Sequence, residues 1–180
     1  EEDDRYIEEF LGSQWLGVRQ KLIGINISAS KRWLTKNWPI SHIVRLCKEL
    51  AQEDLRIVFT GTEKDLVIAN TIQQMLKPIK PINACGKTSI NQLACLIKRC
   101  SVYISPDSAP LHIAASQKVP FVALFGPTEP LRHLPPAKEC IVIKKNLSCS
   151  PCYRSRCKTK RCMVLITPEE VREAVNKFLK

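Results

Sequence analysis

A lysine and several small hydroxyl residues follow the first apolar run of the chain. Ser28, Ser30 and Lys36 all lie in the polar loop at residues 28–38. Hydroxyls and backbone N–H groups can donate hydrogen bonds to phosphate oxygens, and a lysine adds a positive point charge. The loop is therefore a candidate phosphate-binding segment, although an exposed loop that only aids solubility could have the same composition.

The stretch from residue 105 to 112 could bind a second part of the same anion. Asp107, Ser108 and Ala109 lie between an apolar run and a short helical pattern. The first turn of a helix has free N–H groups that attract a pyrophosphate, and Asp107 as the N-cap would fix that turn. His112 points back toward the same end because helical side chains tilt toward the N-terminus, but a histidine there could equally be structural.

Three further loops contribute one candidate residue each. Glu63 follows an apolar run, where a carboxylate can accept the hydroxyls of a ribose or simply favour a helix N-terminus. Thr88 precedes a helix capped by Ser89, and its loop could offer backbone groups to a base or could be a plain helix start. Thr128 lies in a rigid Gly-Pro-Thr-Glu-Pro loop that follows another apolar run.

These loops separate elements that alternate between strand and helix. Short apolar runs indicate strands, and apolar residues spaced three and four apart indicate helices. The expected strands cover residues 22–27, 56–60, 82–85, 102–105, 121–125 and 141–143. The expected helices start at Pro39, residue 63, Ser89, Asp107 and Thr167. This alternation predicts parallel βαβ units in an α/β, doubly wound, Rossmann-like sheet, whose ligands bind at the carboxyl ends of the strands.

The composition excludes several classes of protein. The chain has 180 residues, of which 44% are hydrophobic and 25% charged, as in ordinary soluble domains. No run approaches the roughly 18 uncharged apolar residues of a membrane span, and the acidic start does not match a secretory signal. Because the chain does not begin with Met, we expect residues 1–20 to be an acidic helix and linker from a missing N-terminal domain, and residues 21–180 to form the Rossmann-like domain.

A basic, cysteine-rich segment at residues 149–162 stands apart from these loops. Its cysteines are Cys149, Cys152, Cys157 and Cys162. Four thiols so close together could hold a structural zinc ion, or they could be free thiols or local disulfides. The odd total of nine cysteines favours a reducing, cytoplasmic environment. Seven cations and no acidic residue lie between Cys140 and Cys162, within a chain of net charge +11, which indicates an anionic partner or a solvated face.

Four motifs in these loops together resemble one known family. They are Lys-Asn-Trp-Pro at residues 36–39, Gly-x-Thr-Ser-Ile at 86–90, Asp-Ser-x-x-x-His-Ile-Ala-Ala at 107–115 and Pro-x-Val-Ala-Leu-Phe-Gly-Pro-Thr-x-Pro at 120–130. The chain resembles glycosyltransferase family 9, the ADP-heptose:lipopolysaccharide heptosyltransferases, from about residue 22 to residue 178. The resemblance implies a GT-B enzyme with two Rossmann-like domains, of which this chain matches the C-terminal, donor-binding half.

The resemblance also implies roles at the matching positions. Lys36, Ser28 and Ser30 would contact the donor phosphates. Glu63 would bind the ribose, and Thr88 would line the adenine pocket. The segment from Asp107 to Ala109, with His112, would surround the diphosphate and the sugar. The candidate substrate-binding residues are thus Ser28, Ser30, Lys36, Glu63, Thr88, Asp107, Ser108, Ala109, His112 and Thr128. Ala109 replaces the glycine usual in the family, and its Cβ stands where the backbone would approach the ligand.

The implied reaction is inverting transfer of heptose from ADP-heptose to a lipopolysaccharide-core acceptor, with no required cofactor. The general base of the family is an aspartate of the N-terminal domain, so we expect this chain to bind the donor without transferring sugar. Its expected partners are the donor, a lipid-linked saccharide acceptor at the inner membrane surface and the N-terminal domain. The expected location is cytoplasmic, with peripheral association at that membrane.

Two alternatives remain at this point. One is a nucleic-acid-binding module built on the basic cysteine segment, although only Tyr153 could offer a stacking surface there. The other is a different GT-B-like nucleotide-sugar enzyme, such as an epimerase.

Overall fold

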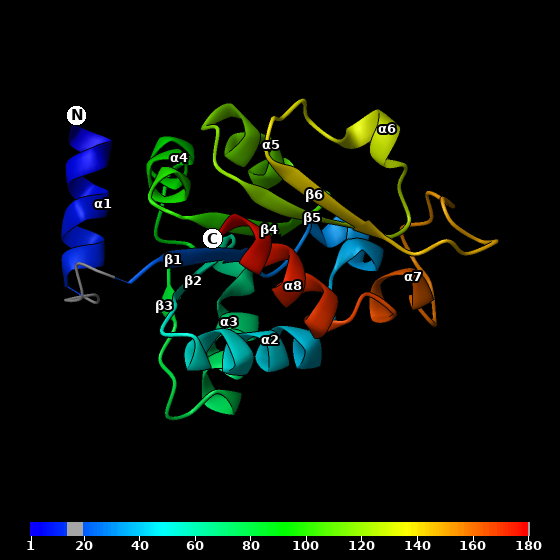
Figure 1. Cartoon of the computed structure of the whole chain (residues 1–180), viewed down its shortest axis with the longest axis horizontal. Coiled ribbons are helices and arrows are strands. Elements are labelled where there is room, and N and C mark those ends of the chain that lie inside the picture. Colours follow the sequence, from blue (N-terminus) through cyan, green and yellow to red (C-terminus); the bar gives the residue numbers. More distant parts are fainter. Residues whose placement is uncertain (14–19, 180) are drawn as a thin grey trace.

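The computed structural model describes residues 1–13 and 20–179, which contain a six-stranded sheet (Figure 1). Its neighbouring strands are all parallel, in the order β3-β2-β1-β4-β5-β6. The strands are β1 (Leu22–Asn26), β2 (Arg56–Thr60), β3 (Ile82–Asn83), β4 (Val102–Pro106), β5 (Phe121–Phe125) and β6 (Cys140–Lys144). The predicted α/β, doubly wound, Rossmann-like fold is confirmed. The strand order reverses between β1 and β4, and ligands of such sheets bind beside that reversal.

Helices cover both faces of the sheet (Figure 1). The helices, with 3-10 helices marked η, are α1 (Glu2–Gly12), η1 (Lys31–Lys36), α2 (Ile40–Gln52), η2 (Glu63–Asp65), α3 (Leu66–Met75), α4 (Ile90–Lys98), α5 (Ala109–Ser116), α6 (Pro130–His133), α7 (Arg161–Val164) and α8 (Pro168–Phe178). Helices α2, α3 and α8 pack on one face, α4 and α5 pack on the other, and α1 packs against α4.

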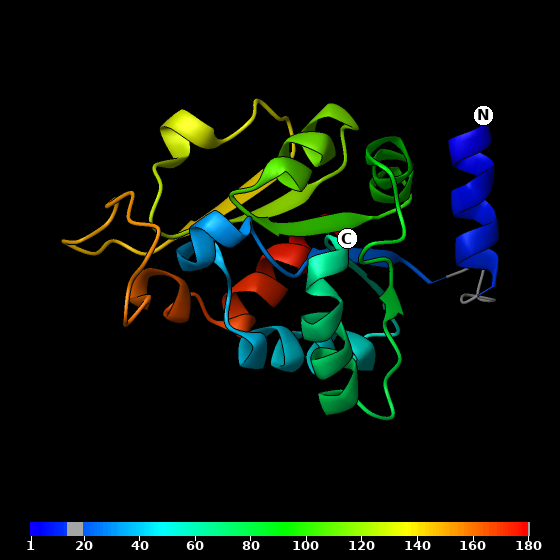
Figure 2. The same ribbon diagram turned by 180° about the vertical axis from the view of Figure 1, so that it is seen from behind.

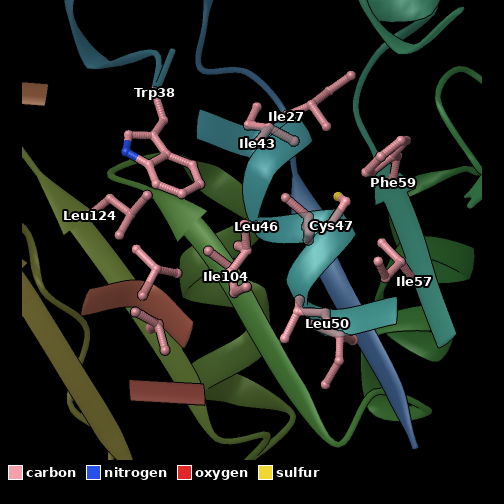
Figure 3. Close-up of a cluster of buried hydrophobic side chains, with 14 of the residues drawn as sticks. Ile27, Trp38, Ile43, Leu46, Cys47, Leu50, Ile57, Phe59, Ile104 and Leu124 are labelled. Atoms are coloured by element: carbon pink, nitrogen blue, oxygen red, sulfur yellow. The ribbon is translucent and has the colours of Figure 1, made fainter. Parts of the chain in front are cut away.

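Each face has its own hydrophobic core because successive side chains of a strand point to opposite faces. Ile57 and Phe59 of β2 point into the α2 side, whereas Val58 between them points into the α4 side. Figure 3 shows the α2 side, where Cys47 and Leu50 of helix α2 lie against the strands. Full burial of one such aliphatic side chain contributes about 1.5–3 kcal/mol, so these two layers hold the strand ends, and the loops that follow them, in place.

The segment after β1 is more ordered than the predicted loop. It forms η1, whose N-cap Ser30 accepts a hydrogen bond from the backbone N–H of Arg32 at 3.2 Å. The Asn37 side chain accepts another from the N–H of Ala29 at 2.7 Å. Both contacts turn the chain back on itself and fix the backbone position from which the Lys36 side chain extends. The predicted strand at residues 82–85 is shorter than expected, because only Ile82–Asn83 pairs with β2.

The acidic N-terminal helix predicted from the sequence is present as α1. Ile7 on its inner face is fully buried, and Arg99 of the segment after α4 donates to Glu8 at 2.8 Å. The predicted linker includes residues 14–19, which lie outside the described residues. In the part of the chain that the structure describes, no helix has both the length and the apolar character needed to span a membrane.

Candidate functional site

A cavity of about 750 Å³ opens at the carboxyl edge of the sheet. Residues that follow β1, β2, β3 and β4 line it, so it lies beside the reversal of strand order. Its volume is within the range of roughly 300–1,000 Å³ for small-molecule sites. The predicted residues that line it are Ser28, Ser30, Lys36, Glu63, Thr88, Asp107, Ser108 and Ala109. The fold therefore brings together candidates that are up to 81 positions apart in the chain.

Lys36 and Asp107 form an ion pair at the wall of this cavity. The Lys36 Nζ is 2.7 Å from Asp107 Oδ2, and the two side chains are only 14% and 7% exposed. Thr128 donates its hydroxyl to the same oxygen at 2.7 Å. Trp33 of η1 adds a cation–π contact, with Lys36 Nζ 5.0 Å from the ring centroid. An anion in the cavity would thus meet a lysine whose position is already set on two sides.

Asp107 is not the N-cap of α5, so that prediction was wrong. The N-cap is Ser108, and no side chain caps the helix. Pro110 in the first turn has no N–H to satisfy, which reduces the need for a cap. The carboxylate of Asp107 instead faces Lys36 and Thr128, where it pairs with an opposite full charge and accepts a hydroxyl hydrogen bond as well.

Asp65 is a site residue that the sequence analysis missed. It is 8% exposed, and its Oδ1 accepts the Ser28 hydroxyl at 2.7 Å. Its Oδ2 accepts both the backbone N–H and the hydroxyl of Thr62, each at 2.7 Å. One carboxylate thereby joins the loop after β1 to the loop after β2. The Thr-x-x-Asp spacing at residues 62–65 is a capping-box signal that could have identified it.

Asn26 makes a similar connection between the loops after β1 and β4. Its side-chain amide donates to the hydroxyl of Ser105 at 3.2 Å and to that of Ser108 at 2.9 Å. Asn26 is 6% exposed and is the last residue of β1. A polar residue at the end of an otherwise apolar strand was the available signal. Together, Asn26 and Asp65 connect three of the four loops that form the cavity.

Glu63 and Thr88 face the cavity from loops that come unusually close together. Gly86, with φ +69°, lies so near η2 that a Cβ there would be 2.7 Å from the Glu63 Cα. Only glycine combines this left-handed backbone with so short an approach. Glu63 is exposed, and its carboxylate forms no ion pair with any described residue. Ile90, 77% exposed at the start of α4, adds an apolar surface to the same lining.

The other two predicted residues lie outside the cavity lining. His112 is exposed on α5. Thr128 is 2% exposed and acts on the site through its hydrogen bond to Asp107. Ala109 lines the cavity as the first residue of α5, with its side chain exposed.

The comparison with protein families decides what kind of chain carries this cavity. Residues 3–163 match Glycosyltransferase family 9 (heptosyltransferase). The chain belongs to this family. The resemblance inferred from the four motifs is therefore confirmed, and the match includes every loop that lines the cavity.

Individual proteins of known sequence or structure support the assignment of this chain to family 9. Lipooligosaccharide heptosyltransferase 2 of Campylobacter jejuni is 33% identical over 166 residues, which are 89% of this chain and 52% of the relative. A family 9 glycosyl transferase of Veillonella parvula superposes with a TM-score of 0.86 at 29% identity, covering 99% of this chain and 52% of that one. The Escherichia coli ADP-heptose lipopolysaccharide heptosyltransferase II superposes with a TM-score of 0.77 at 26% identity, covering 99% and 51%. The chain thus spans about half the length of these relatives.

Whether the cysteine-rich segment of this family 9 chain holds a zinc ion remains a prediction. Among the described residues, no three His, Cys, Asp or Glu side chains are placed to hold a metal ion. Cys149 and Cys157 are exposed, whereas Cys162 is buried on α7. Burial raises the pKa of Cys162. The pKa of Cys157 is lowered, because the N–H of Lys160 donates to its sulfur at 3.4 Å and the Thr159 hydroxyl lies nearby.

Proposed function

We propose that this chain is the donor-binding domain of an inverting glycosyltransferase, which transfers heptose from ADP-heptose to a lipopolysaccharide-core acceptor. The observation that carries the proposal is the single cavity in which Lys36, Glu63, Thr88 and the Asp107 loop meet. An ADP-sugar has an anionic diphosphate between two hydroxyl-rich rings, the ribose and the sugar. The ribose also carries the largely apolar adenine base. The lining offers a cation, an exposed carboxylate and an apolar surface in one place. The Escherichia coli relative is itself an ADP-heptose heptosyltransferase, which supports this donor.

In this proposal, each part of the donor has a group of this chain to bind it. Lys36 and the first N–H groups of α5 bind the diphosphate, and Glu63 accepts the ribose hydroxyls. Thr88 and Ile90 lie against the adenine. Ser28 supports the phosphate loop through Asp65, because its hydroxyl hydrogen is already donated there.

The transfer step requires more than this chain. A base deprotonates an acceptor hydroxyl, whose oxygen then forms a bond to the anomeric carbon from the face opposite the leaving group. The bond from that carbon to the phosphate oxygen breaks, and ADP leaves with the electron pair. Lys36 and the α5 amides would stabilise the charge that develops on the diphosphate. We place the base in a preceding N-terminal domain, joined through residues 1–20, and the acceptor at the inner membrane surface, in a cytoplasmic enzyme.

A comparison of nucleotides by titration calorimetry tests the donor assignment. We expect ADP to bind to this chain more tightly than UDP or GDP. Glu63→Gln should weaken the binding of ADP more than the binding of 2′,3′-dideoxy-ADP. Only ADP has the ribose hydroxyls that would donate hydrogen bonds to the carboxylate. Lys80→Ala, a change of an exposed lysine on the opposite edge of the sheet, is the control and should leave both affinities unchanged. Tighter binding of UDP would favour a different nucleotide-sugar enzyme.

A further inference from the structure

One surface loop carries five cations. We name residues 149–161 the basic loop; its cations are Arg154, Arg156, Lys158, Lys160 and Arg161. None of them forms an ion pair with a residue that the structure describes. All are exposed except Lys160, which is half-buried. By contrast, the preceding Lys144 is paired with Glu129 at 2.7 Å, and Lys145 is paired with Glu170.

The basic loop is fastened to the sheet rather than free like a tail. The N–H groups of Cys152 and Tyr153 both donate to the carbonyl of Pro127, at 3.0 and 2.9 Å. The Ser150 hydroxyl donates to the carbonyl of Gly126 at 2.6 Å. The Thr35 hydroxyl of η1 donates to the carbonyl of Arg154 at 2.7 Å. The backbone therefore presents the cations at a defined place, next to the helix that carries Lys36.

Exposed aliphatic side chains flank the basic loop. Leu131 of α6 is 95% exposed, and Val164 and Leu165, in and just after α7, are 41% and 40% exposed. Both helices lie beside the loop at one end of the molecule in both views (Figures 1 and 2). Cations combined with exposed aliphatic side chains are typical of surfaces that bind the interface of an anionic membrane.

The opposite end of the molecule carries an acidic helix, although Arg99 pairs with two of its carboxylates. Helix α1 lies there, away from the basic loop in both views (Figures 1 and 2). Six of the first nine residues are Asp or Glu, and Arg5 is the only cation among them. A negatively charged plane would attract the basic end and repel the acidic end, so the charge distribution favours one orientation of the molecule.

We infer that the basic loop, with α6 and α7, is a docking surface for an anionic phospholipid bilayer. Nucleic acid fits this surface less well because Tyr153 is its only aromatic residue besides His133. The Tyr153 ring already packs against His133, with ring centroids 5.8 Å apart, and its hydroxyl accepts the N–H of Glu129 at 3.3 Å. Docking through the loop would also bring η1 and the adjoining cavity toward the membrane surface. The inference does not depend on the nucleotide, because no residue of the basic loop lines the cavity.

Vesicle flotation tests this inference directly. We expect the chain to float with vesicles that contain phosphatidylglycerol, not with pure phosphatidylcholine, and to be released by high salt, which shortens the screening length from about 10 Å at 0.1 M to about 3 Å at 1 M. The triple variant Arg154→Glu, Arg156→Glu and Lys158→Glu should lower the partition coefficient by roughly 100-fold or more, given the contribution of each cation near an anionic surface. Its unfolding temperature and ADP affinity should remain those of the parent chain.

A matched variant separates this surface from the effect of net charge. Lys48→Glu, Lys77→Glu and Lys80→Glu changes the charge equally at exposed lysines of α2 and of the segment after α3, and it should still float. Leu131→Ser should lower binding by several-fold without changing the net charge. The inference would be overturned by no flotation of the parent chain, or by equal losses in the two triple variants. It would also be overturned by loop-dependent binding of a single-stranded oligonucleotide without binding to vesicles.

Discussion

The cavity and the basic loop are two cationic regions that hold their charges in opposite ways. In the cavity, Lys36 is largely buried, and its ammonium is bound to Asp107 and lies over Trp33. In the basic loop, Arg154 and its neighbours are exposed and have no acidic partners among the described residues. A fixed, partly desolvated cation suits one small ligand in one orientation. Exposed cations on long side chains suit an extended anionic surface, such as a membrane, whose negative charges have no fixed positions.

The contacts that support each region differ as well. Buried side-chain hydrogen bonds of Asp65, Asn26 and Thr128 connect the loops of the cavity. The basic loop is held mainly by its backbone, through the carbonyl groups of Pro127 and Arg154. Single side-chain changes should therefore damage the cavity, whereas the basic loop should respond mainly to changes in its total charge.

The largest effect should come from Asp65→Ala. This change removes a buried carboxylate that accepts three hydrogen bonds, and it leaves Ser28 and Thr62 without their partner. We expect the free energy of unfolding to fall by about 2–4 kcal/mol, since each charge-assisted bond contributes about 1.5–3 kcal/mol and the effects overlap. Denaturant titration measures it, with Glu9→Ala on α1 as the exposed control. If the free energy of unfolding fell no further than in the control, the carboxylate would not be what holds the two loops together.

Lys36→Ala should have the next largest effect, on ligand affinity. We expect ADP binding to weaken by about 1–3 kcal/mol, the range for hydrogen bonds to charged groups. Arg154→Ala, in the basic loop, should change ADP affinity by less than about 0.5 kcal/mol, as is usual for a surface change away from a site. Titration calorimetry on both variants decides the point. Equal losses would show that the two cationic regions act on the same ligand.

Asp107→Asn separates the ion pair from contact with the ligand. Asparagine keeps the size of the side chain but removes the charge that opposes Lys36. We expect stability to fall by about 1–2 kcal/mol, as for loss of one largely buried charged hydrogen bond. ADP affinity should be retained or increased, because a negative charge near the phosphates is gone. Markedly weaker ADP binding would instead mean that the carboxylate contacts the nucleotide directly.

Thiol reactivity gives the smallest effect and tests the local geometry of the basic loop. Both Cys149 and Cys157 are exposed, but the pKa of Cys157 is lowered by the N–H of Lys160. More of its thiol is therefore ionised near neutral pH, and iodoacetamide should modify Cys157 several-fold faster, since the thiolate is the reactive form. The difference should shrink above the usual thiol range near pH 8.5. Peptide mass spectrometry follows both sites, and a chain unfolded in urea should show no difference.

Within this comparison, the sequence predicted much more of the fold than of the side-chain contacts. The apolar runs identified the six strands, and the residue order after each strand placed most candidates around one cavity. The zinc site stays a prediction, because close spacing along a chain does not by itself make thiols converge, and no three candidate ligands among the described residues are placed to hold a metal ion. The N-cap role of Asp107 was wrong because a partner from another loop competes better for its carboxylate. Whether the candidate residues, His112 and Thr128 included, contact the donor remains a prediction.

The sequence by itself determined the features that depend on near neighbours and on burial: the strands, the capping boxes of α4 and α8, the four motifs and the excess of charge at residues 149–161. Only the tertiary structure decided which groups meet across the sheet. Lys36 and Asp107 are 71 residues apart, and Ser28 and Asp65 are 37 apart. Neither pair follows from spacing, because each depends on the order of the strands, which long-range packing of two hydrophobic layers selects.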